Sequence, residues 1–98
     1  MGHYYTAIKA VGKNRQEAEA SAIHDFFYEH GHRHSLREIE SAKFVRKVPP
    51  KKEVRKDVSG GWRGHLNVPY VRIEMVEDQD APPEQWLEEW EFVLHTHT

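Results

Sequence analysis

The sequence contains no cysteine, which excludes disulfide bonds, cysteine-ligated metal sites and cysteine nucleophiles. It also lacks an apolar run close to the roughly 20 residues that a membrane-spanning helix needs. Its first residues do not show the basic start and apolar stretch of a signal peptide. We therefore expect a cytoplasmic protein that has no membrane partner.

The chain is also short of residues for a large core. Its 98 residues predict a single domain, 1–98. A chain of this size buries only about 60 to 65% of the surface that its unfolded form exposes. Dense packing, a histidine-bound metal or self-association must then add stability, and we favour self-association. Asn, Gln and Met together number only seven beside 31% charged residues, a balance typical of thermophile-like composition.

Motifs for catalysis are missing as well. Ser59-Gly60-Gly61 is not followed by the Lys-Ser/Thr pair that completes a phosphate-binding loop. The serines show neither a nucleophile elbow nor a serine-lysine motif. We assign no catalytic residue, and acid-base chemistry by His and Glu stays open as an alternative.

The first third of the chain predicts a strand followed by a helix. Residues 4–11 are rich in strand formers and alternate between two faces. Asn14 and Glu17 form a capping-box pattern, and Gly31 suits a helix end, so we predict a helix over about 15–30. Spacings of three and four predict one buried stripe on this helix, made of Ala18, Ala22, Ile23, Phe26, Phe27 and His30.

The rest of the chain predicts mainly strands. Residues 35–48 would also suit a capped helix, but their β-branched and aromatic end favours a strand, which Pro49-Pro50 stops. Residues 51–67 suit a protruding hairpin or a flexible loop equally well. Val71, Ile73 and Met75 alternate with polar residues and predict a half-buried strand. Pro82-Pro83-Glu84 suits the start of a short helix, although residues 90–97 also fit a strand.

Charges are strongly segregated along the chain. Residues 41–63 hold eight bases and two acids, whereas residues 74–91 hold eight acids and no base. The two blocks can bind each other within or between subunits, remain solvated, or leave the basic block free for phosphates. A pI near 6.4 argues against a general nucleic-acid binder. The candidate residues for contact with the acidic segment or with nucleic acid are Lys51, Lys52, Arg55, Lys56 and Arg63.

Eight histidines are the most unusual feature of the composition. His30, His32 and His34 occupy alternate positions, and alternate residues of an extended segment point to one side, which suits ligands of Zn, Ni or Cu. His95 and His97 repeat this spacing and would join the site if the tail returned to the helix end. The alternative is that these histidines are solvated or interact with the helix C-terminus.

Four segments together resemble the dodecin family, small proteins of βαββ topology. They are Ala7 to Gly12, Ala18 to Ile23, Leu36-Arg37-Glu38-Ile39 through Phe44-Val45, and Tyr70 to Val76 as the last strand. The resemblance implies an α+β fold in which one helix covers an antiparallel sheet, and assembly into a homo-oligomer. We predict the core at about 4–48 and 68–77; the basic hairpin or loop at about 49–67 and the acidic C-terminal extension at about 78–98 go beyond the usual length of a dodecin.

The resemblance also bears on ligands. Flavin-binding dodecins stack the flavin on a tryptophan of the second strand and hydrogen-bond it with a glutamine of the third, where this chain has Ser41 and Tyr70. We therefore expect no bound flavin and leave the cofactor unknown. Trp62 or Tyr70 offers another stacking face, although aromatic residues in small domains also serve as core or interface. The candidate ligand-binding residues are Ser41, Trp62 and Tyr70.

The function that we expect is a non-enzymatic, dodecin-like, homo-oligomeric binding or storage protein. Its partners would be further copies of itself and a small ligand or a polyanion. The alternatives are a nucleic-acid-binding domain that uses the basic residues of 43–63, and a small His/Glu enzyme or histidine-metal protein.

Overall fold

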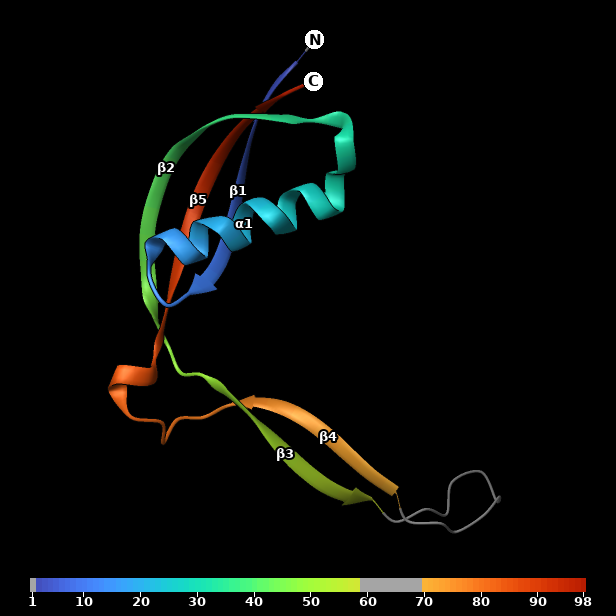
Figure 1. The fold of residues 1–98 in the computed structure, drawn as a ribbon, viewed down its shortest axis with the longest axis vertical. Helices are drawn as coiled ribbons and strands as arrows, with labels where there is room; N and C mark the ends of the chain where they lie inside the picture. Colours follow the sequence, from blue (N-terminus) through green and yellow to red (C-terminus); the bar gives the residue numbers. More distant parts are fainter. Residues whose placement is uncertain (1, 59–69) are drawn as a thin grey trace.

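One α-helix packs on a three-stranded antiparallel sheet, and a two-stranded hairpin extends beyond that sheet (Figure 1). The computed structural model describes residues 2–58 and 70–98. The sheet consists of β1 (His3–Gly12), β5 (Leu87–His97) and β2 (Ser35–Val48), in the order β1-β5-β2. This arrangement confirms the predicted α+β fold of βαββ type, with the hairpin inserted between the second and third strands of the sheet.

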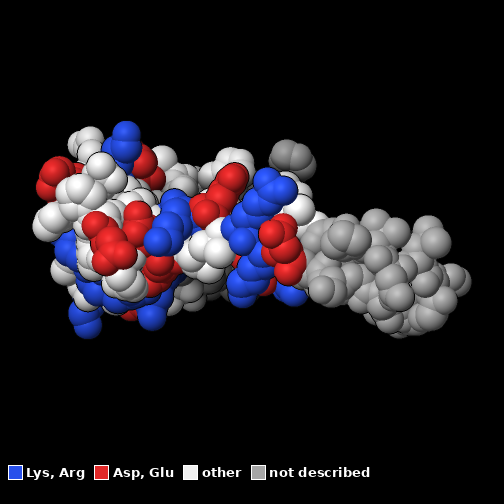
Figure 2. Space-filling model, turned by 90° about the horizontal axis from the view of Figure 1, so that it is seen from below, with Lys and Arg blue, Asp and Glu red and all other residues white. Residues whose placement is uncertain are grey.

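The hairpin consists of β3 (Lys51–Val58) and β4 (Tyr70–Glu77), paired from Lys51 opposite Glu77 to Val58 opposite Tyr70. We call these two strands the arm. It projects from the end of the sheet that lies opposite the two chain termini (Figure 1). Lys and Arg side chains are mixed with Asp and Glu side chains along it (Figure 2). A hairpin within 51–67 was one of the two predictions for this region, and residues 51–58 do form a hairpin strand, but its partner is β4 at 70–77. The predicted turn at 59–61 and the predicted second strand around 62–66 lie outside the described residues.

The helix α1 (Arg15–His30) has the predicted bounds because both of its ends are determined locally. The Glu17 backbone N–H donates to Asn14 Oδ1 at 2.9 Å, and Glu17 Oε1 accepts from the Lys13 backbone N–H at 3.3 Å. Gly31 ends the helix with a φ of 64°, which favours glycine. A Cβ atom on Gly12 would clash with the backbone of Glu17 and Ala18, so strand and helix start approach too closely for any other residue.

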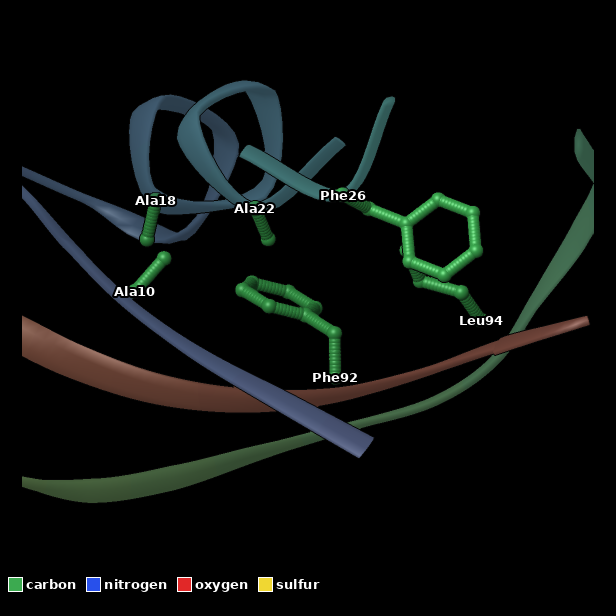
Figure 3. Close-up of a cluster of buried hydrophobic side chains, with 6 residues drawn as sticks. All are labelled: Ala10, Ala18, Ala22, Phe26, Phe92 and Leu94. Carbon is green, nitrogen blue, oxygen red and sulfur yellow. The ribbon is translucent and has the colours of Figure 1, made fainter. Parts of the chain in front are cut away.

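The core lies between α1 and the strands beneath it (Figure 3). Ala18, Ala22 and Phe26 of the helix pack against Ala10 of β1 and against β5, whose Phe92 and Leu94 are fully buried. Ile23 and Phe27 are partly buried at the edge of this cluster, which confirms their place in the predicted stripe. His30 is exposed, so its assignment to the buried stripe is corrected.

The third strand of the sheet is β5, and the prediction that 68–77 supplies it is wrong. Instead β4 belongs to the arm, outside this sheet, and its residues Val71, Ile73 and Met75 are 44, 62 and 55% exposed. The predicted acidic extension therefore includes the central strand of the sheet. The predicted short helix is reduced to the 3-10 turn Pro83–Gln85, after which the alternative of a strand over 90–97 is confirmed.

Strand β2 is confirmed as a strand, but it is irregular. Its 14 residues lie along the 11 residues of β5, with register shifts after Leu36, Ile39 and Phe44. Extra residues of this kind are β-bulges, which bend an edge strand and discourage pairing with other chains. The bends let β2 arch around the sheet (Figure 1). They also space its core-facing Leu36, Ile39 and Ala42 three residues apart instead of two.

Within the described residues, no helix combines the length and apolar character that crossing a membrane requires.

Candidate functional site

A cluster of polar side chains lies on the face of the sheet away from α1. Because successive residues of a strand point to opposite faces, burial of Leu94 against the helix turns His95 to the other face. There Tyr5 of β1 and Glu38 of β2 stand directly opposite His95. We call His3, Tyr5, Glu38, Glu40 and His95 the histidine cluster.

His95 is held at both ring nitrogens. Its Nε2 lies 3.2 Å from Nδ1 of His3, and its Nδ1 lies 3.4 Å from Oε1 of Glu38. The Tyr5 ring stacks on the imidazole with centroids 4.4 Å apart and planes inclined by 15°. The His95 side chain is only 9% exposed, against 59% for Glu38. The imidazole is therefore held in one orientation by its contacts with His3, Glu38 and Tyr5.

The first bulge of β2 assembles this cluster. Leu36 pairs with Thr96, so an uninterrupted register would place Arg37 opposite His95, but the shift brings Glu38 there. Glu38, Glu40 and His95 then offer ligand atoms that all lie within 4.8 Å of one another. Imidazole and carboxylate groups at such separations suit either a divalent transition metal or proton transfer. The sequence signals for this face were the alternation along residues 90–97 and the spacing of His95 and His97, and neither reveals the bulge.

The histidines predicted as metal ligands lie elsewhere. His30 and His34 approach each other with ring centroids 5.8 Å apart, and Phe26 packs against both. Nδ1 of His34 lies 3.3 Å from the Thr96 hydroxyl, on the helix side of β5. The side chain of His32 lies outside what the structure describes. The tail does return to the helix end, but the sheet separates this pair from His95 and His97.

The predicted ligand-binding residues are not brought together. Ser41 lies on β2 opposite Val93, in the three-stranded sheet. Tyr70 begins β4 opposite Val58, in the arm. Trp62 falls outside the described residues. A site that needs both Ser41 and Tyr70 is therefore divided between two separate sheets within one chain.

The basic and acidic blocks bind each other within one chain. Lys52 pairs with Asp78 at 3.5 Å, Lys56 with Glu74 at 3.2 Å, and Lys47 with Glu88 at 3.4 Å. Such exposed pairs contribute only about 0.2 to 1 kcal/mol each. They leave the described arm with nearly balanced charge, as the mixed colours of Figure 2 show. The predicted phosphate contact at Arg63 lies outside the described residues.

Arg55 and Arg46 form further ion pairs, of which the first lies within the basic block. The Arg55 guanidinium lies 3.9 Å from Asp57, its neighbour two residues along β3. The Arg46 guanidinium bridges Glu89, at 3.2 Å, and Glu77, at 3.9 Å. Since Glu77 belongs to β4 and Glu89 to β5, Arg46 ties the base of the arm to the sheet.

Among the residues that the structure describes, Glu88 has a pKa that departs clearly from its ordinary value. The Trp90 indole Nε1–H donates to Glu88 Oε1 at 2.9 Å and is the main cause that lowers the pKa of this carboxyl. Desolvation opposes this effect, and Lys47 adds to it. This carboxylate therefore helps to hold the end of β5 against β2, away from the histidine cluster.

The described residues thus offer two features beyond the core, the histidine cluster at the end of the sheet near the termini and the arm at the other end. No family model, no curated protein and no solved structure matches this chain.

Proposed function

We propose that this protein is a non-enzymatic, homo-oligomeric binding protein whose subunits associate through the arm. The observation that carries the proposal is the exposed apolar stripe of β4. Val71, Ile73 and Met75 are alternate residues, so they share one face of the arm, and they are 44, 62 and 55% exposed. An isolated two-stranded hairpin is marginally stable in water, so a stripe of this kind favours a protein partner.

The charges on the same face indicate that this partner is a second copy of the chain. Lys51, Glu53, Arg55 and Asp57 alternate along β3 on the face that carries the stripe. From Lys51 to Asp57 the charges follow the order positive, negative, positive, negative, and from Asp57 to Lys51 the order is reversed. Two such strands laid antiparallel therefore place unlike charges opposite each other.

The centre of the apolar stripe fits the same symmetry. A two-fold axis through the Val54 and Glu74 pair brings Lys51 opposite Asp57 of the second copy, and Glu53 opposite Arg55 of the second copy. The same axis brings Ile73 opposite Met75 of the second copy, and Val71 opposite Glu77 of the second copy. One operation thus matches the charges of β3 and the two central apolar residues of β4, whereas Val71 lies at the edge of the apolar contact.

Two further points support this proposal over nucleic-acid binding. Four of the five bases in the described arm already face acids within the chain, as in the pairs Lys52 with Asp78 and Lys56 with Glu74, so little positive charge is left for phosphates. The resemblance to dodecins, which are homo-oligomers, favours self-association as well. In such an assembly a small ligand would bind between subunits.

The first test replaces the centre of the stripe. Sedimentation velocity and native mass spectrometry of the native protein are expected to show a defined oligomer, and Ile73→Glu is expected to give monomers. Tyr28→Glu is the matched control, because Tyr28 is 84% exposed on the helix. A native protein that is monomeric at tens of micromolar, or an Ile73→Glu variant that assembles like the native chain, would overturn the proposal.

A charge exchange tests the symmetry itself. Glu53→Arg and Arg55→Glu alone each place like charges opposite each other across the two-fold axis, so each is expected to weaken assembly. The double variant restores unlike pairs and is expected to assemble like the native chain. If the double variant is no better than either single variant, the arms do not pair in this register.

A further inference from the structure

Two ring nitrogens of the histidine cluster lie at the distance from each other that two ligands of one metal ion have. Nδ1 of His3 and Nε2 of His95 are 3.2 Å apart. Bonds of about 2.0 to 2.1 Å from a tetrahedral zinc ion place two nitrogen ligands about 3.3 Å apart. We propose that His3 and His95 bind a divalent transition metal ion of the zinc type on the face of the sheet away from α1.

Glu38 acts as the group that orients His95. Its Oε1 lies 3.4 Å from Nδ1, on the side of the ring away from His3. A proton held on Nδ1 by this carboxylate leaves the lone pair of Nε2 free for the metal, the arrangement in which carboxylates support histidine ligands in metalloproteins. Stacking by Tyr5 and the 9% exposure of His95 fix the ring further.

His97 can supply a third ligand once its ring turns toward the other two, because its nitrogens do not lie within 4.8 Å of both of theirs, as the ligand atoms of Glu38, Glu40 and His95 do of one another. It stands directly opposite His3 in the register of β1 and β5, on the same face as His95. Its ring centroid lies 6.2 Å from that of His3. Three imidazoles with a water molecule would complete a four-coordinate site. Such a ligand set selects zinc, cobalt, nickel or copper over magnesium and calcium, which prefer oxygen ligands.

This site does not rest on the proposed assembly. All of its residues belong to one chain, at the end of the sheet near the termini, whereas the arm projects from the opposite end (Figure 1). A monomeric Ile73→Glu variant is therefore expected to bind metal as the native chain does. The experiments can therefore refute the proposed assembly and the proposed metal site independently of each other.

Calorimetric titration of the full chain with zinc chloride tests the proposal, together with the visible absorption of a cobalt-loaded sample. We expect one ion per chain, tetrahedral cobalt bands, and no competition from a large excess of magnesium. His3→Gln is expected to weaken zinc binding by at least about tenfold, and Glu38→Gln by about 10 to 100-fold, the usual cost of losing an orienting carboxylate. His3 is exposed, so its variant keeps the fold, which far-ultraviolet circular dichroism verifies.

Two matched variants complete the design. His24→Gln removes a histidine on α1 whose side chain is 78% exposed, and it is expected to leave zinc binding unchanged. His30→Gln disrupts the pair on the other side of the sheet and is also expected to have no effect. The proposal is overturned if the native chain binds no zinc, if His3→Gln binds as tightly as the native chain, or if His30→Gln abolishes binding.

Discussion

Truncation of Phe26 tests the packing on which the whole fold depends. This side chain is 2% exposed and belongs to the core cluster with Phe92 and Leu94. Its ring also contacts Phe27 and His30, with centroids 5.1 and 4.5 Å away. Phe26→Ala removes these contacts and leaves a cavity, which costs about 3 to 5 kcal/mol. A small domain is stable by only about 5 to 15 kcal/mol, so the loss is a large share of the total.

Thermal unfolding followed by circular dichroism measures this loss. Each kcal/mol shifts the midpoint of a domain of this size by about 4 to 8 °C, so Phe26→Ala is expected to lower it by about 12 to 40 °C. Protein concentration must be equal for all variants, because self-association adds to apparent stability. Glu29→Ala is the control on the exposed side of the same helix. If Glu29→Ala lowered the midpoint more than Phe26→Ala, our assignment of the buried face would be wrong.

Three further predictions concern the start of the helix, the acidic strand and the arm. Gly12→Ala is expected to lower the free energy of unfolding, measured with urea, by about 1 to 3 kcal/mol, because the added methyl group meets the backbone at the start of the helix. A decrease of less than a few tenths of a kcal/mol would contradict this close approach. Since the pKa of Glu88 is lowered in the folded state, its stabilising contribution is present above the ordinary value of 4.5 and is lost as pH falls through the folded pKa. Trp90→Phe is expected to raise that pKa toward 4.5 in an NMR titration of the Glu88 carboxyl group, and an unchanged titration would refute the role of the indole. Replacing four bases of the arm by Glu is expected to weaken assembly in sedimentation experiments; the four are Lys51, Lys52, Arg55 and Lys56. An unchanged oligomer, together with tight and salt-sensitive RNA binding by the native chain, would instead support the nucleic-acid alternative.

The elements that could be predicted from the sequence are those whose signals are local. Asn14, Glu17 and Gly31 determine both ends of α1 through hydrogen bonds and backbone conformation within a few residues. The spacing of Ala18, Ala22 and Phe26 marks the buried face because a helix has one period whatever lies beneath it. The charge blocks were visible in the same way, although sequence alone left open whether they meet within one chain.

The central strand was decided only by tertiary structure. Both β4 and β5 show strand alternation, and the cleaner apolar pattern of Val71, Ile73 and Met75 favoured the wrong one. In the folded chain β5 pairs with β1 and β2 at once and buries Phe92 and Leu94 under the helix. Pairing between strands far apart in sequence sets this choice, and the pattern within a single strand does not contain it.

The histidine cluster shows the same division at the level of single residues. Alternation along β5 is enough to place His95 on the face opposite Leu94, and this much the sequence determines. Which residue meets His95 depends on the bulge in β2, which brings Glu38 there in place of Arg37. The bulge is a feature of the pairing between β2 and β5, two strands far apart in the sequence, so a carboxylate instead of a guanidinium stands beside the imidazole because of the tertiary structure.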